Sequence, residues 1–292
     1  MSIPSFTRLV RFIPKSSNDV LIGEPASPDV DVGAETRAGK DVEVKVHSGP
    51  SILSPGPATG KTEIIGKLLS PLAPSEVGTI RCIGLNYVQH AKEAKMAIPT
   101  VPTVFLKPAT SLADPYPAPT IIPKPTLATD TCDFESELVI VLGRDCKNVS
   151  ESEALDYVLG YTASNDVSSR DAQFAQSQWS YSKGFDGACP IGPVVVSKGL
   201  VPDPAKLFMK GRKNGKVLQS CGIDDLIFSV EKIVSFLSQG TTLPAGTIIL
   251  TGTPAGVGFS FNPKEYLRAG DEFSVEISPY IGTLTTVFEA EK

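Results

Sequence analysis

The run Phe134-Glu-Ser-Glu-Leu-Val-Ile-Val-Leu142 sets the character of the whole chain. Its apolar residues occupy both alternating positions, which is typical of a strand covered on both faces. Glu135 and Glu137 would then point to the same side, about 6.5–7 Å apart along the strand. Carboxylates on one face are ordinarily solvated, but buried ones repel each other unless a cation lies between them. The run therefore predicts either a charged surface or a site for a hard divalent ion such as Mg²⁺, Mn²⁺ or Ca²⁺.

A third acid follows in Asn165-Asp166-Val-Ser-Ser-Arg170-Asp171. Asp166 falls where a predicted strand over 161–166 ends and a helix begins, a common place for functional residues. A turn or capping role is the alternative. Taken with the two glutamates, Asp166 strengthens the prediction of a metal site with three carboxylate ligands.

The segment Asn86-Tyr-Val-Gln-His90-Ala-Lys-Glu93 contains one of the chain's two histidines. His90 and Glu93 are three residues apart and would be neighbours on one helix face. A carboxylate beside an imidazole selects its tautomer and raises its basicity, as a general base requires. An exposed helical pair is the alternative. His47 lies in the N-terminal segment, so a histidine base, if the protein uses one, would be His90.

Cationic and glycine-rich segments could bind an anion. Arg170 and Gln173 lie one helix turn apart, and Lys183 follows Trp179 by four residues. These side chains could hold a substrate carboxylate, although a solvated lysine is the alternative. The loop Thr251-Gly-Thr-Pro-Ala-Gly-Val-Gly258 would let backbone N–H groups approach an anion, or would only make a tight connection.

The rest of the chain predicts an α+β fold dominated by strands. Further strands, divided by glycine and proline, are expected at residues 193–196, 247–251, 272–277 and 283–288. Helices are expected at residues 86–96, from the capping box at Ser150 and Glu153 to Gly160, from Ser168 toward Trp179, and at 230–237. Residues 1–76 would form a small β-rich N-terminal segment that ends in a linker at 71–75, and residues 77–292 the main domain.

Composition excludes several classes of protein. The chain has 292 residues, 41% of them apolar, and a net charge of −5 without a basic stripe, which argues against nucleic acid as a partner. No apolar run approaches the roughly 20 residues that span a bilayer, so we expect a soluble protein. Five scattered cysteines without a C-x-x-C pair favour a reducing compartment such as the cytoplasm.

Two N-terminal patterns point elsewhere but more weakly. Arg8, Arg11 and Lys15 precede the first acid, a faint sign of mitochondrial import, yet the alternation over 6–13 fits a half-buried first strand better. Gly56-Pro-Ala-Thr-Gly60-Lys-Thr62 is similar to a Walker A motif but is one residue short and lacks a preceding parallel strand. Neither pattern changes the expectation of a non-nucleotide enzyme.

Seven motifs occur together and in order along residues 78–290. They are Arg81-Cys-Ile-Gly-Leu-Asn-Tyr-x-x-His90-Ala-x-Glu93, Phe105-Leu-Lys107-Pro108, Phe134-Glu-Ser-Glu-Leu138, Asn165-Asp-Val-Ser-x-Arg170-Asp-x-Gln173, Trp179-x-x-x-Lys183-x-x-Asp186, Pro190-Ile-Gly-Pro193 and Thr251-Gly-Thr-Pro-x-Gly-Val-Gly258. The series resembles the fumarylacetoacetate hydrolase family, in particular its short members, the acylpyruvases, oxaloacetate decarboxylases and oxaloacetate tautomerases. Residues 261–277 are most similar to members associated with oxaloacetate.

The resemblance implies a fold of mixed, rolled β-sheets, usually in a homodimer. It implies that Glu135, Glu137 and Asp166 bind Mg²⁺ or Mn²⁺. His90 and Glu93 would form a base dyad on a lid that orders when substrate binds. Substrate carboxylate and oxo groups would be held by Arg170, Gln173 and Lys183, and Thr253 would close the pocket.

The implied substrate is a small 2-oxo or 1,3-dicarbonyl acid. In the hydrolytic reaction His90 activates water, the C–C bond of an acylpyruvate breaks, and the resulting enolate is stabilised by the metal and Lys183. Decarboxylation of oxaloacetate would pass through the same enolate, and keto–enol tautomerisation of oxaloacetate needs only proton transfer. A non-catalytic binding scaffold and a redox or nucleotide enzyme are the alternatives of other classes.

Overall fold

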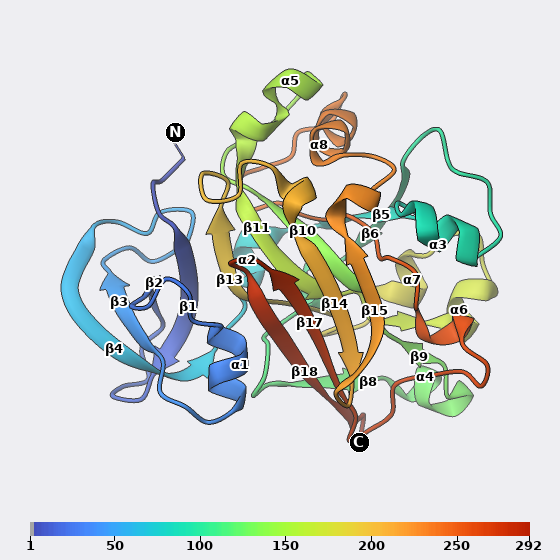
Figure 1. The fold of residues 1–292 in the computed structure, drawn as a ribbon, viewed down its shortest axis with the longest axis horizontal. Coiled ribbons are helices and arrows are strands. Elements are labelled where there is room, and N and C mark those ends of the chain that lie inside the picture. The colour runs from blue at the N-terminus through green and yellow to red at the C-terminus, as the bar shows by residue number, and fades with distance from the viewer. Residues whose placement is uncertain (1–2) are drawn as a thin grey trace.

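The computed structural model describes residues 3–292, and strands dominate it (Figure 1). The largest sheet has eleven strands. Ten of them follow the order β2 (Leu21–Pro25), β3 (Glu43–His47), β4 (Ala58–Leu68), β1 (Arg8–Pro14), β13 (Cys189–Ser197), β11 (Val158–Asn165), β10 (Ser136–Leu142), β16 (Ile248–Leu250), β5 (Ile80–Gly84) and β6 (Thr103–Lys107), and β7 (Leu112–Ala113) pairs with β13. This arrangement confirms the predicted strand-dominated α+β class.

A second sheet of five strands packs in front of the first in Figure 1. Its order is β15 (Lys216–Gly222), β14 (Phe208–Lys213), β17 (Glu272–Ser278), β18 (Gly282–Ala290) and β8 (Pro119–Ile122). A third, small sheet joins β9 (Cys132–Asp133) to β12 (Ser168–Ser169). The apolar residues between the two large sheets form the main core of the protein.

Strand β10 lies in the middle of the large sheet, and every one of its side chains is buried. It pairs antiparallel with β11 and with β16. Leu138 and Ile140 belong to the core that also contains Phe273 of β17, whereas Val139 and Val141 belong to a second core on the other face. The prediction of a strand covered on both faces is therefore confirmed.

The N-terminal strands β1 to β4 form a curved part of the large sheet at the left of Figure 1. Strand β1 connects this part to the rest, because Arg8 and Leu9 pair with Val196 and Val195 of β13. Arg8 is buried and donates to the carbonyls of Pro28 and Val30. The predicted first strand is thus confirmed, but it is mostly buried instead of half-buried, and Arg8 has a structural role.

The helices are short and lie around the sheets. The structure has α1 (Val32–Arg37), α2 (Pro74–Val77), α3 (Val88–Glu93), α4 (Lys124–Thr129), α5 (Glu151–Ala154), α6 (Arg170–Phe174), α7 (Ser180–Lys183) and α8 (Val230–Ser238), with single 3₁₀ turns at Ala109–Ser111, Leu155–Tyr157, Pro204–Lys206, Ile223–Asp225 and Gly258–Ser260. Helix α8 matches its prediction and begins at the cap Ser229. No helix among residues 3–292 is long and apolar enough to cross a membrane.

Two helix predictions were wrong in their extent. The capping box of Ser150 and Glu153 is present, but the chain enters β11 at Val158 instead of continuing as helix to Gly160. Gly160 lies in β11, where a side chain would meet the Val196 carbonyl at 2.0 Å, so this glycine permits close strand packing instead of ending a helix. The helix expected from Ser168 toward Trp179 is only α6, which begins at Arg170 because Ser168 and Ser169 pair with β9, and which ends at Phe174, well before Trp179.

Candidate active site

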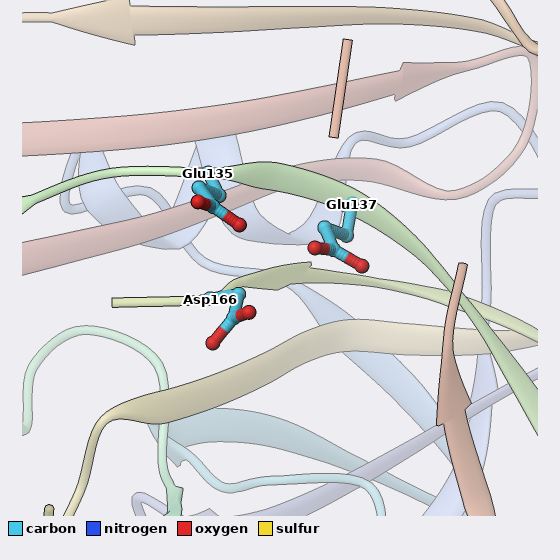
Figure 2. Close-up of side chains that lie close together, drawn as sticks. All are labelled: Glu135, Glu137 and Asp166. Carbon is cyan, nitrogen blue, oxygen red and sulfur yellow. The ribbon is translucent and has the colours of Figure 1, made fainter. Parts of the chain in front are cut away.

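The three predicted carboxylates lie together inside the protein. Figure 2 shows Glu135, Glu137 and Asp166 converging on one small space, and one oxygen of each lies within 4.8 Å of the others. All three are buried. Glu137 is on β10, as the sequence predicted. Glu135 was predicted to lie on the same strand, but it lies just before β10 begins at Ser136. The Asp166 N–H donates to the Glu135 carbonyl and the Glu135 N–H to the Asn165 side chain, which fixes their separation.

Two buried lysines neutralise part of this cluster. Lys183 donates to Glu135 Oε2 at 2.7 Å, Asp166 Oδ2 at 2.8 Å and Ser168 Oγ at 2.7 Å. Lys107, on β6, donates to the second oxygen of Asp166 and to the Ala188 carbonyl. Burial lowers the pKa of both ammonium groups, but attraction to the neighbouring carboxylates is stronger than this effect. The pKa of each lysine is therefore raised.

The two glutamates have opposite electrostatic environments. Burial raises the pKa of Glu135, but Lys183 and Arg170 outweigh it and lower the value to about 2. Burial together with repulsion from Asp166 and Glu135 raises the pKa of Glu137 well above its ordinary value. Among residues 3–292 no lysine or arginine forms an ion pair with Glu137, and the Gly252 N–H donates to it at 2.7 Å. Glu137 is therefore the carboxylate whose ionised form has no cationic partner among the described residues.

This charge distribution fits a divalent cation. The buried carboxylates of Asp133, Glu135, Glu137 and Asp166 face the three buried cations Lys107, Lys183 and Arg170, which leaves one negative charge. A divalent ion would reverse the sum to one positive charge, which the carboxylate of a substrate would then neutralise. Three carboxylates are also the hard oxygen donors that Mg²⁺ and Mn²⁺ prefer. The cluster could thus bind a divalent metal ion.

The predicted base dyad is formed on α3. His90 Nδ1 and Glu93 Oε2 are 3.0 Å apart, which leaves Nε2 of the imidazole for the cavity. The other oxygen of Glu93 accepts from the Gly256 N–H at 3.0 Å, so one carboxylate both orients His90 and holds α3 against the glycine-rich loop. Burial raises the pKa of Glu93, but its hydrogen bonds with His90 and Gly256 outweigh this and lower it.

Arg170 is held from several sides and keeps one free donor. Its Nε donates to Asp133 Oδ2 at 2.7 Å, and its Nη1 donates to Gln173 Oε1 at 2.7 Å and lies 2.8 Å from Glu135 Oε1. Its Nη2 is buried and has no protein partner among the described residues. A buried N–H group without a partner is costly, and a substrate oxygen would satisfy it.

One cavity collects most of these side chains. It encloses about 120 Å³, and its lining includes seven predicted residues, His90, Glu135, Glu137, Arg170, Gln173, Lys183 and Thr253. Glu93 and Asp166 lie behind this lining and contact the cavity residues His90 and Lys183. The structure therefore brings all the predicted site residues to one place.

Four buried residues that support the site had no role assigned to them from the sequence. Lys107 pairs with Asp166, and Asn165 fixes Glu135. Asp133 accepts from Arg170 and from the N–H groups of Gly258 and Phe259. Gln219 links Ser136 to the Thr253 hydroxyl. For Lys107 a signal existed, because it is a charge at the end of the apolar, strand-like run 104–106.

Comparison with known proteins identifies the family. Residues 79–289 match the family model described as fumarylacetoacetate (FAA) hydrolase C-terminal. The chain is 43% identical to a caffeoylpyruvate hydrolase of Neonothopanus nambi, over 99% of this chain and 95% of that protein. It is 40% identical to an oxaloacetate tautomerase of Bacillus subtilis, over 75% of this chain and 72% of that protein.

A solved structure shares the whole fold. The crystal structure of a 2-hydroxyhepta-2,4-diene-1,7-dioate isomerase from Mycobacterium marinum superposes with a TM-score of 0.79, at 33% identity, and the match covers 98% of this chain and 99% of that one. The sequence motifs, the fold and these relatives agree, and this chain belongs to the fumarylacetoacetate hydrolase family.

Proposed function

We propose that this protein is a divalent-metal-dependent enzyme that hydrolyses a C–C bond in an acylpyruvate-type substrate. The observation that supports it is the position of the His90–Glu93 dyad, whose imidazole lines the same cavity as Glu135, Glu137 and Lys183. The relative named caffeoylpyruvate hydrolase matches 99% of this chain, including the N-terminal strands, whereas the oxaloacetate tautomerase matches 75%. The extent of the match favours hydrolysis.

The metal would be held by Glu135, Glu137 and Asp166, and we propose Mg²⁺ or Mn²⁺. When bound, such an ion supplies a Lewis acid that polarises a 2-oxo acid. Residues around the metal site would bind the carboxylate of the substrate. Arg170 would direct its free Nη2–H toward the substrate carboxylate, and Gln173 would keep the guanidinium in place through its bond to Nη1.

The proton transfers can be assigned to residues of the chain. His90 would take a proton from water at Nε2, because its Nδ1 faces Glu93. The water oxygen would bond to the distal acyl carbonyl carbon, and the C–C bond to the pyruvyl methylene would break with its electron pair leaving on the pyruvyl side. Lys183 would stabilise the negative charge that develops there. The proton on His90 would then return to the methylene carbon, which gives pyruvate and a carboxylic acid.

Reactions on oxaloacetate are the second candidate. Decarboxylation or keto–enol tautomerisation would use the same cation-lined cavity but would need no water attack. The relative named oxaloacetate tautomerase, 40% identical, favours this alternative. For a non-catalytic scaffold, by contrast, we expect no need for a histidine that is oriented by a carboxylate at a buried cavity.

Three further proposals concern the surroundings of the enzyme. We propose a homodimer, as the motif resemblance implies, and a location in the cytoplasm, which the reduced and buried state of all five cysteines supports. The division into residues 1–76 and 77–292 is the third proposal. The two parts share one sheet, since β1 belongs to the same sheet as β10 and β11.

The test is turnover of a substrate panel with Mg²⁺, Mn²⁺ or EDTA. The panel contains acetylpyruvate, fumarylpyruvate and oxaloacetate in its keto and enol forms. We expect metal-dependent cleavage of an acylpyruvate, which His90→Ala should slow by about 10²–10⁴-fold, the usual range of general base catalysis. Activity on oxaloacetate alone would contradict hydrolysis, and release of CO₂ would then separate a decarboxylase from a tautomerase.

A further inference from the structure

We propose that the acyl-binding part of this cavity is built for a planar aromatic or conjugated acyl group. This inference rests on the proposed hydrolysis of acylpyruvates and concerns the part of the substrate that the metal and the dyad do not specify. It follows from two series of side chains, each of which begins at a buried cation and continues through aromatic rings of the cavity lining.

The first series begins at Arg170. Its guanidinium carbon lies 4.7 Å from the centre of the Phe259 ring, and Phe259 contacts Phe174 edge-to-face at 5.6 Å and 83°. The backbone of Phe259 is fixed, because its N–H donates to Asp133, the same carboxylate that holds Arg170. The series therefore has a rigid inner end, and it ends at Phe174, whose side chain is 65% exposed.

The second series begins at Lys183. Its ammonium lies 5.2 Å from the centre of the Phe105 ring, and Phe105 contacts Trp179 edge-to-face at 5.7 Å and 67°. Phe105 lies on β6, distant in sequence from Phe174 and Phe259, whereas Trp179 follows Phe174 by five residues and directly precedes α7. The same cavity is thus lined by aromatic rings from four separate positions in the chain.

Gly84, at the end of β5, makes room for one of these rings. A Cβ atom at this buried position would lie 2.1 Å from Cζ3 and 3.0 Å from Cη2 of Trp179. The indole therefore rests directly on the glycine backbone. A larger residue at position 84 would displace the indole, which lines the same cavity as Gly84. Gly84 is therefore a positioning residue for the aromatic lining.

The size of the cavity indicates where the acyl group lies. Its 120 Å³ is well below the roughly 300–1,000 Å³ of pockets that enclose drug-sized ligands. The cationic inner part therefore accommodates a small oxo acid, and a larger acyl group must extend to the mouth, where Phe174 and Met96 are both more than half exposed. Rings that already meet edge-to-face favour a further planar ring, whose edges and faces complement theirs.

The first measurement compares acyl groups of matched size. Benzoylpyruvate and cyclohexanecarbonylpyruvate have the same number of acyl carbons, but only the first carries a planar ring. Because their chemical reactivities differ, the informative quantity is how their kcat/KM ratio changes on mutation. We expect Phe174→Leu, which keeps an apolar side chain but removes the ring, to lower the ratio of benzoyl to cyclohexyl substrate by about threefold to tenfold.

Phe208→Leu is the matched control. Phe208 is also an exposed phenylalanine, but it lies on β14 outside the cavity lining, so the ratio should stay at the wild-type value. An unchanged ratio in Phe174→Leu, or an equal change in both variants, would overturn the inference.

Binding separates this inference from the proposed reaction. Trp179 is the only tryptophan of the chain, so intrinsic tryptophan fluorescence reports on this cavity. Titration of the Mg²⁺-loaded protein with 4-phenyl-2-oxobutanoate and 4-cyclohexyl-2-oxobutanoate, corrected for ligand absorbance, uses acids that lack the second carbonyl and are not cleaved. We expect tighter binding of the phenyl acid, by about threefold or more, and loss of this preference in Phe174→Leu. If no acylpyruvate is hydrolysed but the preference is found, the proposed reaction is wrong and the aromatic site stands; equal affinities overturn the aromatic site whatever the reaction.

Discussion

Lys107 illustrates how much depends on one charge inside the protein. Its side chain is fully buried, and its ammonium pairs with the fully buried Asp166 and with the Ala188 carbonyl. Neither charge could be taken out of water alone, because an unpaired buried ion is very unfavourable. The pair therefore holds the Asp166 carboxylate in position.

We predict that Lys107→Met lowers the free energy of unfolding by about 3–5 kcal/mol, since it leaves Asp166 without this partner. Lys15 is the comparison, because it pairs with Asp41 at the surface, where both side chains are more than half exposed. Lys15→Met should cost less than about 1 kcal/mol. Urea unfolding followed by circular dichroism measures both values, and equally small losses would show that Lys107 does not stabilise the cluster.

Gly256 is a second residue with a specific backbone role. Its φ of +98° lies in the region that favours glycine, and a Cβ atom would meet the Leu218 carbonyl at 2.1 Å. Its N–H donates to Glu93. We predict that Gly256→Ala displaces this N–H and lowers kcat/KM for the proposed reaction by at least tenfold, more than its effect on thermal stability would explain. Ala255→Gly, at the neighbouring position, is the control and should retain turnover; wild-type activity in Gly256→Ala would contradict the prediction.

At the scale of elements, α3 is a short helix attached to the rest of the site through Glu93. The helix has six residues, and its C-terminal continuation over 94–102 exposes Met96, Ile98 and Val101. A helix of this length has little stability of its own and depends on tertiary contacts. The bond from Gly256 to Glu93 is one such contact, and it involves the same carboxylate that orients His90.

The lowered pKa of Glu93 gives this contact a predicted pH dependence. Because the docked helix favours the ionised carboxylate, the stabilisation is fully present above the ordinary pKa of 4.5 and is lost as the pH falls through the lowered value. Hydrogen exchange of residues 88–102, corrected for intrinsic rates, should therefore show less protection at pH 3–4 than at pH 7. In Glu93→Gln the protection should be low at both pH values, while a peptide from α8 serves as the internal control. Equal protection at both pH values in the wild type would refute the role of Glu93 in docking.

For the whole molecule, the carboxylate cluster joins parts of the chain that are distant in sequence. Glu137 lies on β10, Asp166 follows β11, and Lys107 and Lys183 come from β6 and α7. A cation bound there would be held by the native fold and not by the unfolded chain, so it would stabilise the fold by mass action.

We predict that Mg²⁺ raises the midpoint of thermal unfolding, with a gain that grows with the logarithm of the Mg²⁺ concentration and reaches about 2.7 kcal/mol at 100 times the dissociation constant. Glu137→Gln should abolish the shift, because it removes the carboxylate that no lysine or arginine within residues 3–292 neutralises. Glu289→Gln, an exposed glutamate on β18, should keep it. A shift of the same size in all three proteins would place the bound ion elsewhere.

Local sequence was sufficient for much of the site and the fold. The apolar run at 138–142 predicted a strand covered on both faces, since each face needs its own apolar residues. His90 and Glu93 were predicted as a pair because three residues along a helix bring two side chains together, and their 3.0 Å separation agrees. Motif order along the chain predicted the family, which the relatives confirm.

Element ends were less predictable, because they depend on contacts with other parts of the chain. Gly160 follows a capping box and could have ended a helix, but β13 approaches too closely for any other residue there. Ser168 and Ser169 could have opened a helix, but they pair with β9. At Gly160 a strand from elsewhere in the chain outweighs the local preference for a helix, whereas pairing of Ser168 and Ser169 only delays the helix, which begins at Arg170.

The sequence by itself therefore determined which residue types the site contains, in what order, and which strand is buried, since these follow from chemistry and periodicity over a few residues. Only the tertiary structure decided that Lys107 and Lys183 neutralise Glu135 and Asp166 but leave Glu137 unpaired, and that rings from β6, α6 and two other segments line one cavity. The physical reason is that electrostatic balance and cavity shape are sums over residues close in space, and most of those residues are far apart in the chain.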